Sequence, residues 1–231
     1  MSNIRIKGYD LSGCNLSRAN LCKTSILSCA TTGTQFSGAN MSECTITNGT
    51  YDNCDFSGAN MTGCVATASQ LSQANLSMAN LTNADFGEAN LAGATLAGAT
   101  LSGTNFCGAV LSRAIVDDCD FSSSRMNSKT KLEDVKLSKE QASAVIKKGA
   151  STGKSLTKKD LRGVNISRYK INTYDFSGSD ISSANMMGAQ MQSINISGCL
   201  MEKVNLLQAT MTSCTATKAD FSGGANMNKY I

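Results

Sequence analysis

The sequence has no histidine, no proline and no tryptophan among its 231 residues, and aromatic residues make up only 5%. Histidine is the commonest general base and metal ligand near neutral pH, so its absence lowers the expectation of an enzyme. The shortage of aromatic side chains favours a core of small and medium-sized residues used many times. We therefore expect no catalytic residue, no metal site and no cofactor.

Long apolar runs are also absent: no stretch approaches the length needed to cross a bilayer, and the first residues do not form a secretory signal. Ten cysteines are present, but none of their spacings is the CxxC or CxxH pair of a zinc site. We expect a cytoplasmic protein in a reducing compartment, and delivery to a host cell remains an alternative.

A period of five residues runs through most of the chain. Large apolar residues recur every fifth position from Leu11 to Met126, interrupted only by Thr31 and Ala66, and the same register resumes at Leu156. In the first of these stretches the residue two positions before the large one is nearly always small, and Asn or Asp is frequent between the two, as in Ala59-Asn60-Met61. Residues two apart in an extended segment face the same side, so both apolar columns point inward. An odd period demands a turn in every unit, and Ser57-Gly58 is a suitable turn pair.

The segment "ANLSMANLTNADFGEANLAGATLAGATL" resembles the pentapeptide-repeat family, whose consensus is A-(D/N)-L-x-x. The resemblance covers residues 11 to 126 and again 161 to 221. It implies an all-β solenoid, a right-handed quadrilateral β-helix with four pentapeptides in each coil. We expect one repeat block over 1–128, a helical and basic insertion over 129–155, and a second block with a C-terminal cap over 156–231.

The insertion predicts one short helix. Ser138 followed by Gln141 is a capping box, residues 139–148 are good helix formers, and Gly149 suits the stop. The expected packing face consists of Leu137, Ala142, Val145 and Ile146.

The repeat also gives most cysteines a structural role. Eight of the ten occupy the small inward position, where cysteine acts as a slightly larger alanine. Cys44 and Cys64 would stack one coil apart, within reach of a disulfide, although a reducing cytosol favours thiols. Cys22 and Cys107 follow the large residue and should lie nearer the surface. The eight inward cysteines are Cys14, Cys29, Cys44, Cys54, Cys64, Cys119, Cys199 and Cys214.

The second block departs from the family pattern in its small column. Larger residues there predict local widening or side chains turned outward, and an extra glycine near residue 223 shifts the register, making Met227 the last inward residue. Tyr230 and Ile231 could close the C-terminal end or join two copies there as a homodimer. The larger residues of the column are Val164, Tyr169, Tyr174, Ile194 and Val204.

Positive charge is concentrated in one segment. The formal net charge is −3 over 1–128, +8 over 129–170 and −1 over 171–231. The sequence G-x-x-x-G-K-S at 149–155 lacks both the spacing and the strand-to-helix context of a phosphate-binding loop. The candidate partner-binding patch consists of Lys147, Lys148, Lys154, Lys158, Lys159, Arg162 and Arg168.

These features predict a non-enzymatic interaction scaffold that binds a macromolecular partner through flat solenoid faces. The expected partner is a protein, and an acidic surface, an anionic lipid or a nucleic acid are alternatives for the basic insertion. The family resemblance implies two other functions. One is a DNA mimic that modulates DNA gyrase, for which the −3 charge of the first block is weak support. The other is a bacterial effector that acts in a host cell.

Overall fold

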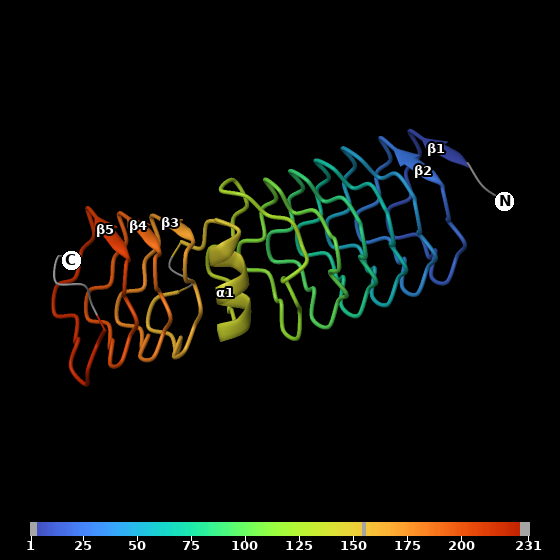
Figure 1. The fold of residues 1–231 in the computed structure, drawn as a ribbon. Coiled ribbons are helices and arrows are strands. Elements are labelled where there is room, and N and C mark those ends of the chain that lie inside the picture. Colours follow the sequence, from blue (N-terminus) through green and yellow to red (C-terminus); the bar gives the residue numbers. More distant parts are fainter. Residues whose placement is uncertain (1–3, 154–155, 227–231) are drawn as a thin grey trace. The chain divides into compact units, whose positions relative to one another are not determined.

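The computed structural model describes residues 4–153 and 156–226 and divides into two compact units, Met1–Lys136 and Leu137–Ile231. Unit 1 contains the short strands β1 and β2, and unit 2 contains the helix α1 and the strands β3, β4 and β5 (Figure 1). Their bounds are Arg5–Lys7 for β1, Ser25–Leu27 for β2, Lys139–Lys147 for α1, Lys170–Asn172 for β3, Gln190–Gln192 for β4 and Thr210–Thr212 for β5.

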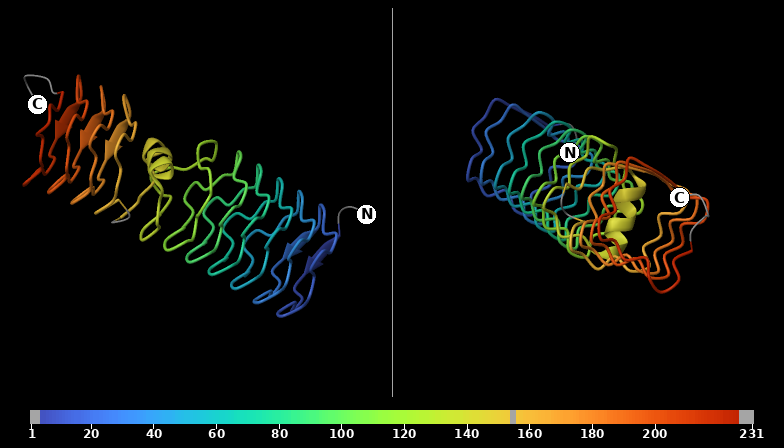
Figure 2. Two further views of the ribbon diagram at one scale, coloured as in Figure 1. Left: turned by 90° about the horizontal axis from the view of Figure 1, so that it is seen from below. Right: turned by 90° about the vertical axis from the view of Figure 1, so that its left-hand side faces the viewer.

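Within each unit the chain coils with a repeat of twenty residues. Parallel bridges join residues twenty apart, as in Asp55 to Asn75 and Asn60 to Asn80 of unit 1, and β3, β4 and β5 pair in the same register in unit 2. Bridged positions recur every five residues, so four pentapeptides make one coil. Figure 2 shows the successive coils of each unit in parallel planes. The predicted period and the β-helix are confirmed.

One pentapeptide illustrates how the backbone is satisfied. The Phe56 N–H donates to the Asn75 carbonyl of the next coil over 2.7 Å, and the Ala59 N–H donates back to the Phe56 carbonyl over 3.0 Å to close a turn. The Ser57 N–H donates to Oδ1 of Asp55 over 3.0 Å. Asn and Asp are frequent before the large residue because their side chains bind this turn amide.

The inward columns form the core of each unit. Phe36, Phe56 and Phe86 are fully buried, as are most small residues two positions before such side chains. Phe36 and Phe56 stack with their ring centroids 4.9 Å apart. The predicted inward columns are buried through the middle of each unit, whereas residues near the described ends are only half-buried, as Leu11, Leu16, Met211 and Phe221 are, or exposed, as Ala216 is.

Polar residues in the small column follow a regular rule. At most positions where Thr, Ser or Cys occupies it, the side chain donates to the carbonyl 23 residues earlier, one coil back. This bond satisfies a buried polar group that would otherwise be costly. Examples are Thr34 to Leu11 over 2.7 Å, Ser69 to Ile46 over 2.6 Å, and Cys119 to Leu96 over 3.0 Å.

The expectation that eight cysteines are buried is wrong at two positions. Cys14 is exposed and Cys214 is only half-buried, whereas the other six are buried. Cys14 lies in the first described coil of unit 1 and Cys214 in the last described coil of unit 2, so no described coil covers either of them on its outer side. Cys22 and Cys107 are half-buried, which agrees with their predicted places nearer the surface.

The register shifts by one residue at two places. Val110 pairs with Lys131, so β-pairing in unit 1 continues past residue 128 after one extra residue. In unit 2, Asn205 pairs with Asn226, which confirms the predicted shift at the extra glycine. Met227, Tyr230 and Ile231 lie outside the described residues.

No helix among the described residues is long and apolar enough to span a membrane.

Tyr51 is the largest fully buried side chain among the described residues, and its hydroxyl donates to the Ile26 carbonyl over 3.1 Å. Its ring occupies the space beside Gly49, because a Cβ on Gly49 would overlap Cε2 of Tyr51. Gly49 stands in the small column, where alanine is otherwise common. The Tyr51 ring therefore leaves no room for a side chain at position 49, which explains why this position is glycine.

We predict that Gly49→Ala lowers the free energy of unfolding by about 1–3 kcal/mol, because the new methyl group overpacks the core. Urea denaturation followed by circular dichroism measures the effect. In a Tyr51→Leu background, which matches Leu71 one coil later, Gly49→Ala should cost much less. An equal cost in both backgrounds would show that the ring is not the cause.

Candidate partner-binding surface

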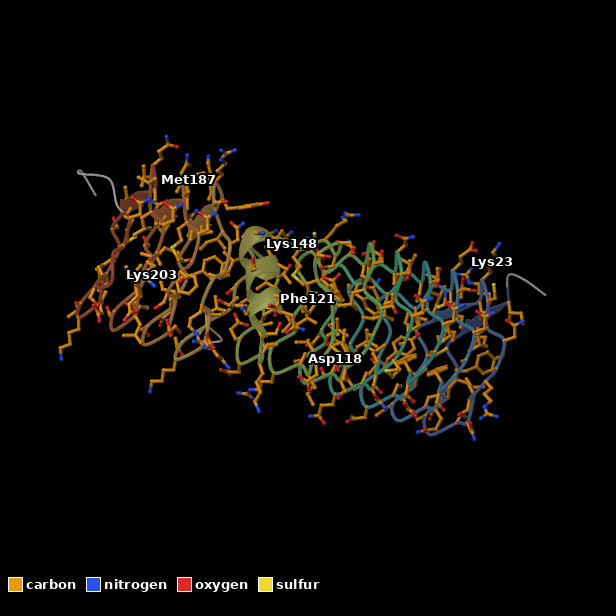
Figure 3. All side chains as sticks on the ribbon, turned by 60° about the horizontal axis from the view of Figure 1, so that its bottom comes forward. Lys23, Asp118, Phe121, Lys148, Met187 and Lys203 are labelled. Carbon is orange, nitrogen blue, oxygen red and sulfur yellow. The ribbon has the colours of Figure 1, made fainter. Side chains whose placement is uncertain are left out.

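The helix α1 places Lys147 on the surface of unit 2. Ser138 and Gln141 form the predicted capping box: the Gln141 N–H donates to Ser138 Oγ over 3.2 Å, and the Ser138 N–H donates to Gln141 Oε1 over 2.8 Å. The predicted packing face is buried. The helix ends at Lys147, and Lys148 is its C-cap. Figure 3 labels Lys148 at the end of α1.

Lys147 lies against an aromatic ring. Its Nζ is 5.6 Å from the ring centroid of Tyr169, a distance that allows a cation–π interaction. Tyr169 stands in the small column yet is 42% exposed, so its side chain has turned outward. Tyr174, five residues later in the same column, is buried and donates its hydroxyl to the Ala150 carbonyl over 2.7 Å. Burial raises the pKa of Tyr174 above its ordinary value.

Two further basic residues flank Tyr169. Arg168 is exposed at a turn with φ 63°, and its aliphatic part fits against Gly188 of the next coil, where an added Cβ would meet Arg168 Cγ at 3.5 Å. Lys170 is exposed at the start of β3. We call Lys147, Arg168, Tyr169 and Lys170 the basic–aromatic cluster.

The three positive charges of this cluster are not neutralised by neighbouring carboxylates among the described residues. Within the described parts of the chain, none of its three cations lies in an ion pair. A hollow of about 360 Å³ starts at Lys170 and is lined by the outward residues of β3, β4 and β5 together with Met191. No carboxylate lines this hollow. The surface is cationic at β3 and polar but uncharged toward β5.

Arg162, another residue of the predicted patch, is engaged elsewhere. Its Nε and Nη2 donate to Oδ1 and Oδ2 of Asp160 over 2.9 and 2.7 Å, and Nε lies 3.7 Å from Asp180 Oδ2. The hydrogen bonds from Arg162 hold the pKa of Asp160 well below its usual range. Two carboxylates therefore balance this guanidinium.

The other predicted residues are dispersed. Lys158 is exposed at a turn and Lys159 is half-buried in the same pentapeptide, two units along the chain before Arg168. Lys148 is half-buried, and Lys154 lies outside the described residues. Of the predicted patch, Lys147 lies over the Tyr169 ring, and Arg168 precedes Tyr169 directly in the chain.

The sequence analysis did not include Tyr169 or Lys170 among the site residues. A usable signal existed: a tyrosine in a column reserved for small residues, with a basic residue on either side. The column alone could not separate Tyr169 from Tyr174, because one side chain turns outward and the other inward. The two rings differ in burial and in partner: Tyr169 lies under Lys147 at the surface, whereas the Tyr174 hydroxyl donates to the Ala150 carbonyl in the interior.

Unit 1 offers a different surface. A hollow of about 450 Å³ lies along the turns that contain Gln73, Gly93 and Arg113. Arg113 Nε there lies 3.7 Å from Oδ2 of Asp134, and both side chains are exposed. This hollow presents charges of both signs. The described residues contain no group of three or more Cys, Asp or Glu side chains arranged to hold a metal ion.

A family model described as pentapeptide repeats matches this chain in eight copies, over residues 1–42, 52–87, 89–127 and 189–227. The chain therefore belongs to the pentapeptide-repeat family. No curated protein matches the sequence.

Solved structures give distant likenesses. Full-length QnrB1, a plasmid-mediated fluoroquinolone resistance protein, is 14% identical over 94% of this chain and 93% of its own, with a TM-score of 0.44. HetL, a pentapeptide-repeat protein involved in heterocyst differentiation regulation in the cyanobacterium Nostoc sp. strain PCC 7120, is 21% identical over 95% of this chain and 86% of its own, with a TM-score of 0.24. Because both sequence identities and both TM-scores are low, these likenesses carry no functional argument for this chain.

We predict that Asp160 stays ionised in acid at a pH where most exposed aspartates are protonated, and that Arg162→Ala raises its pKa toward the ordinary value. Carbon-13 NMR titration of the carboxyl groups measures both. Asp10 and Asp220, whose pKa values are lowered by Ser12 and Ser222, serve as internal controls and should not move. An unchanged Asp160 titration in Arg162→Ala would contradict the pairing.

Proposed function

We propose that this protein is a non-enzymatic interaction scaffold that binds an acidic surface of a partner protein through the basic–aromatic cluster. The observation that carries the proposal is three exposed cations that form no ion pair with any described residue: Lys147 over the Tyr169 ring, and Arg168 and Lys170 on either side of Tyr169 in the chain. Charges left without internal partners are available to steer and orient a partner of opposite sign.

The architecture supports contact with a large partner. In the proposed right-handed quadrilateral solenoid, each coil presents outward side chains at a regular spacing while the interior stays filled. The hollow beside β3, β4 and β5 is lined by extended, polar positions, which suits a flat protein surface better than an enclosed small molecule. The insertion at 129–155, between repeat blocks over 1–128 and 156–231, supplies Lys147 to this face.

A protein is favoured over a nucleic acid because the cationic surface is small. Three cations beside an uncharged polar face can match a local acidic patch, whereas a phosphate backbone calls for a long row of basic contacts. Exposed charge pairs contribute about 0.2–1 kcal/mol each. Three of them give enough energy to set the choice and orientation of a partner.

We predict that the triple variant Lys147→Glu, Arg168→Glu and Lys170→Glu weakens partner binding by about tenfold or more, through loss of attraction and new repulsion. Cross-linking pull-down with quantitative mass spectrometry identifies proteins captured by the wild type. Titration of each purified partner then measures the affinity, which should fall with rising salt.

A matched control reverses three exposed cations outside the cluster, with Arg18→Glu, Lys203→Glu and Lys218→Glu. It changes the net charge by the same amount and should keep the partners. Equal losses in both variants would indicate a general charge effect and contradict the cluster. If the wild-type protein captures no protein that a control bait does not also capture, the proposed scaffold function is contradicted.

A further inference from the structure

Cys44 and Cys64 occupy equivalent positions in adjacent coils of unit 1. The bridges Asn40 to Asn60 and Thr45 to Val65 fix this register. Both thiols are fully buried, and their Sγ atoms lie 3.0 Å apart. This is a contact between sulfur atoms without a bond, because a disulfide measures about 2.05 Å.

The pair departs from the rule that most other polar residues of the small column follow, as does Ser124, which donates to the Phe121 carbonyl of its own pentapeptide over 2.9 Å. Cys54 donates to the Thr31 carbonyl 23 residues earlier, and Cys199 donates in the same way to Phe176. Cys44 and Cys64 contact each other's sulfur instead. Among the described cysteines, no other pair is brought into sulfur–sulfur contact. The coil spacing is about 4.8 Å, within the Cα separation that disulfides span.

We propose that Cys44 and Cys64 form an oxidation site, at which hydrogen peroxide converts the two thiols into a disulfide that joins adjacent coils of unit 1. One thiol first attacks the peroxide and becomes a sulfenic acid, with release of one water. The second thiol attacks the sulfenic sulfur, forms the disulfide and releases another water. The net reaction consumes two thiols and one peroxide and gives one disulfide and two waters.

The surroundings set the conditions for this reaction. Contact with Cys44 and burial raise the pKa of the Cys64 thiol well above its ordinary value. Burial likewise raises the pKa of Cys54 to about 11. Because the thiolate is the reactive form, oxidation is slow at neutral pH and faster in alkali. Peroxide is small enough to enter when neighbouring coils separate briefly.

To test the proposal, the folded, fully reduced protein is treated with hydrogen peroxide and its remaining thiols are blocked with an alkylating agent. The protein is then cleaved with a protease that cuts after acidic residues. Cleavage after Glu43, Asp52, Asp55 and Asp85 places Cys44 in fragment 44–52 and Cys64 in fragment 56–85. We expect these fragments linked, with loss of two hydrogen atoms. The unfolding temperature should rise by about 5–10 °C, reversibly with reductant.

Two variants make the test specific. Cys44→Ala should fold, because Ala84 occupies the same column, and it should show neither the linked fragments nor the shift in unfolding temperature. Cys54→Ala, which removes a buried cysteine bonded to a carbonyl, should keep both. The proposal is overturned if Cys44 and Cys64 stay reduced while exposed Cys14 is oxidised, or if the two stop at sulfinic acid without a link.

Discussion

The backbone hydrogen bond from the large inward residue of most pentapeptides to the next coil is the interaction on which the structure depends. It recurs every five residues, as from Leu76 to Thr95 and from Leu81 to Thr100, and it fixes a displacement of one coil per twenty residues. Because an odd period would carry alternate side chains to opposite faces, a turn must follow each bond. That turn keeps one set of side chains inside and one set outside along each unit.

This constraint divides the positions of the sequence into inward ones, where few residue types are tolerated, and outward ones, where many are. Inward positions are limited by volume and by the need to satisfy buried polar groups, so a tyrosine at 51 demands a glycine at 49, and a cysteine at 54 bonds to a carbonyl one coil back. Outward positions carry no such limit. The basic–aromatic cluster arises where Tyr169 leaves the interior and joins Arg168 and Lys170 on the outer surface, and α1 adds Lys147. In this account the interior determines the fold and the outer surface determines the partner.

The sequence predicted features that depend on the period alone. These were the apolar columns, the stacking of Cys44 on Cys64 and the register shift at the extra glycine, and the local motif Ser138–Gln141 separately predicted the capping box. Features that depend on neighbours in other coils could not be read from it. Arg162 is balanced by Asp180, eighteen residues away, and Cys14 is exposed because no described coil covers it. Tyr169 and Tyr174 share a column and differ in burial, so the candidate site was predicted only in part.

Amide hydrogen exchange measured by NMR tests the central claim most directly. The account predicts protection with a period of five, slow at the amides that bond across coils and fast at the residue after each large one. Ser77 and Ala97 occupy this fast position in adjacent coils: Asn75 accepts a bond from the Ser77 amide, whereas Thr95 precedes Ala97 without an Asx oxygen. Ala97 should therefore exchange faster than Ser77. Alternating protection with a period of two, or equal exchange at all five positions, would contradict the account.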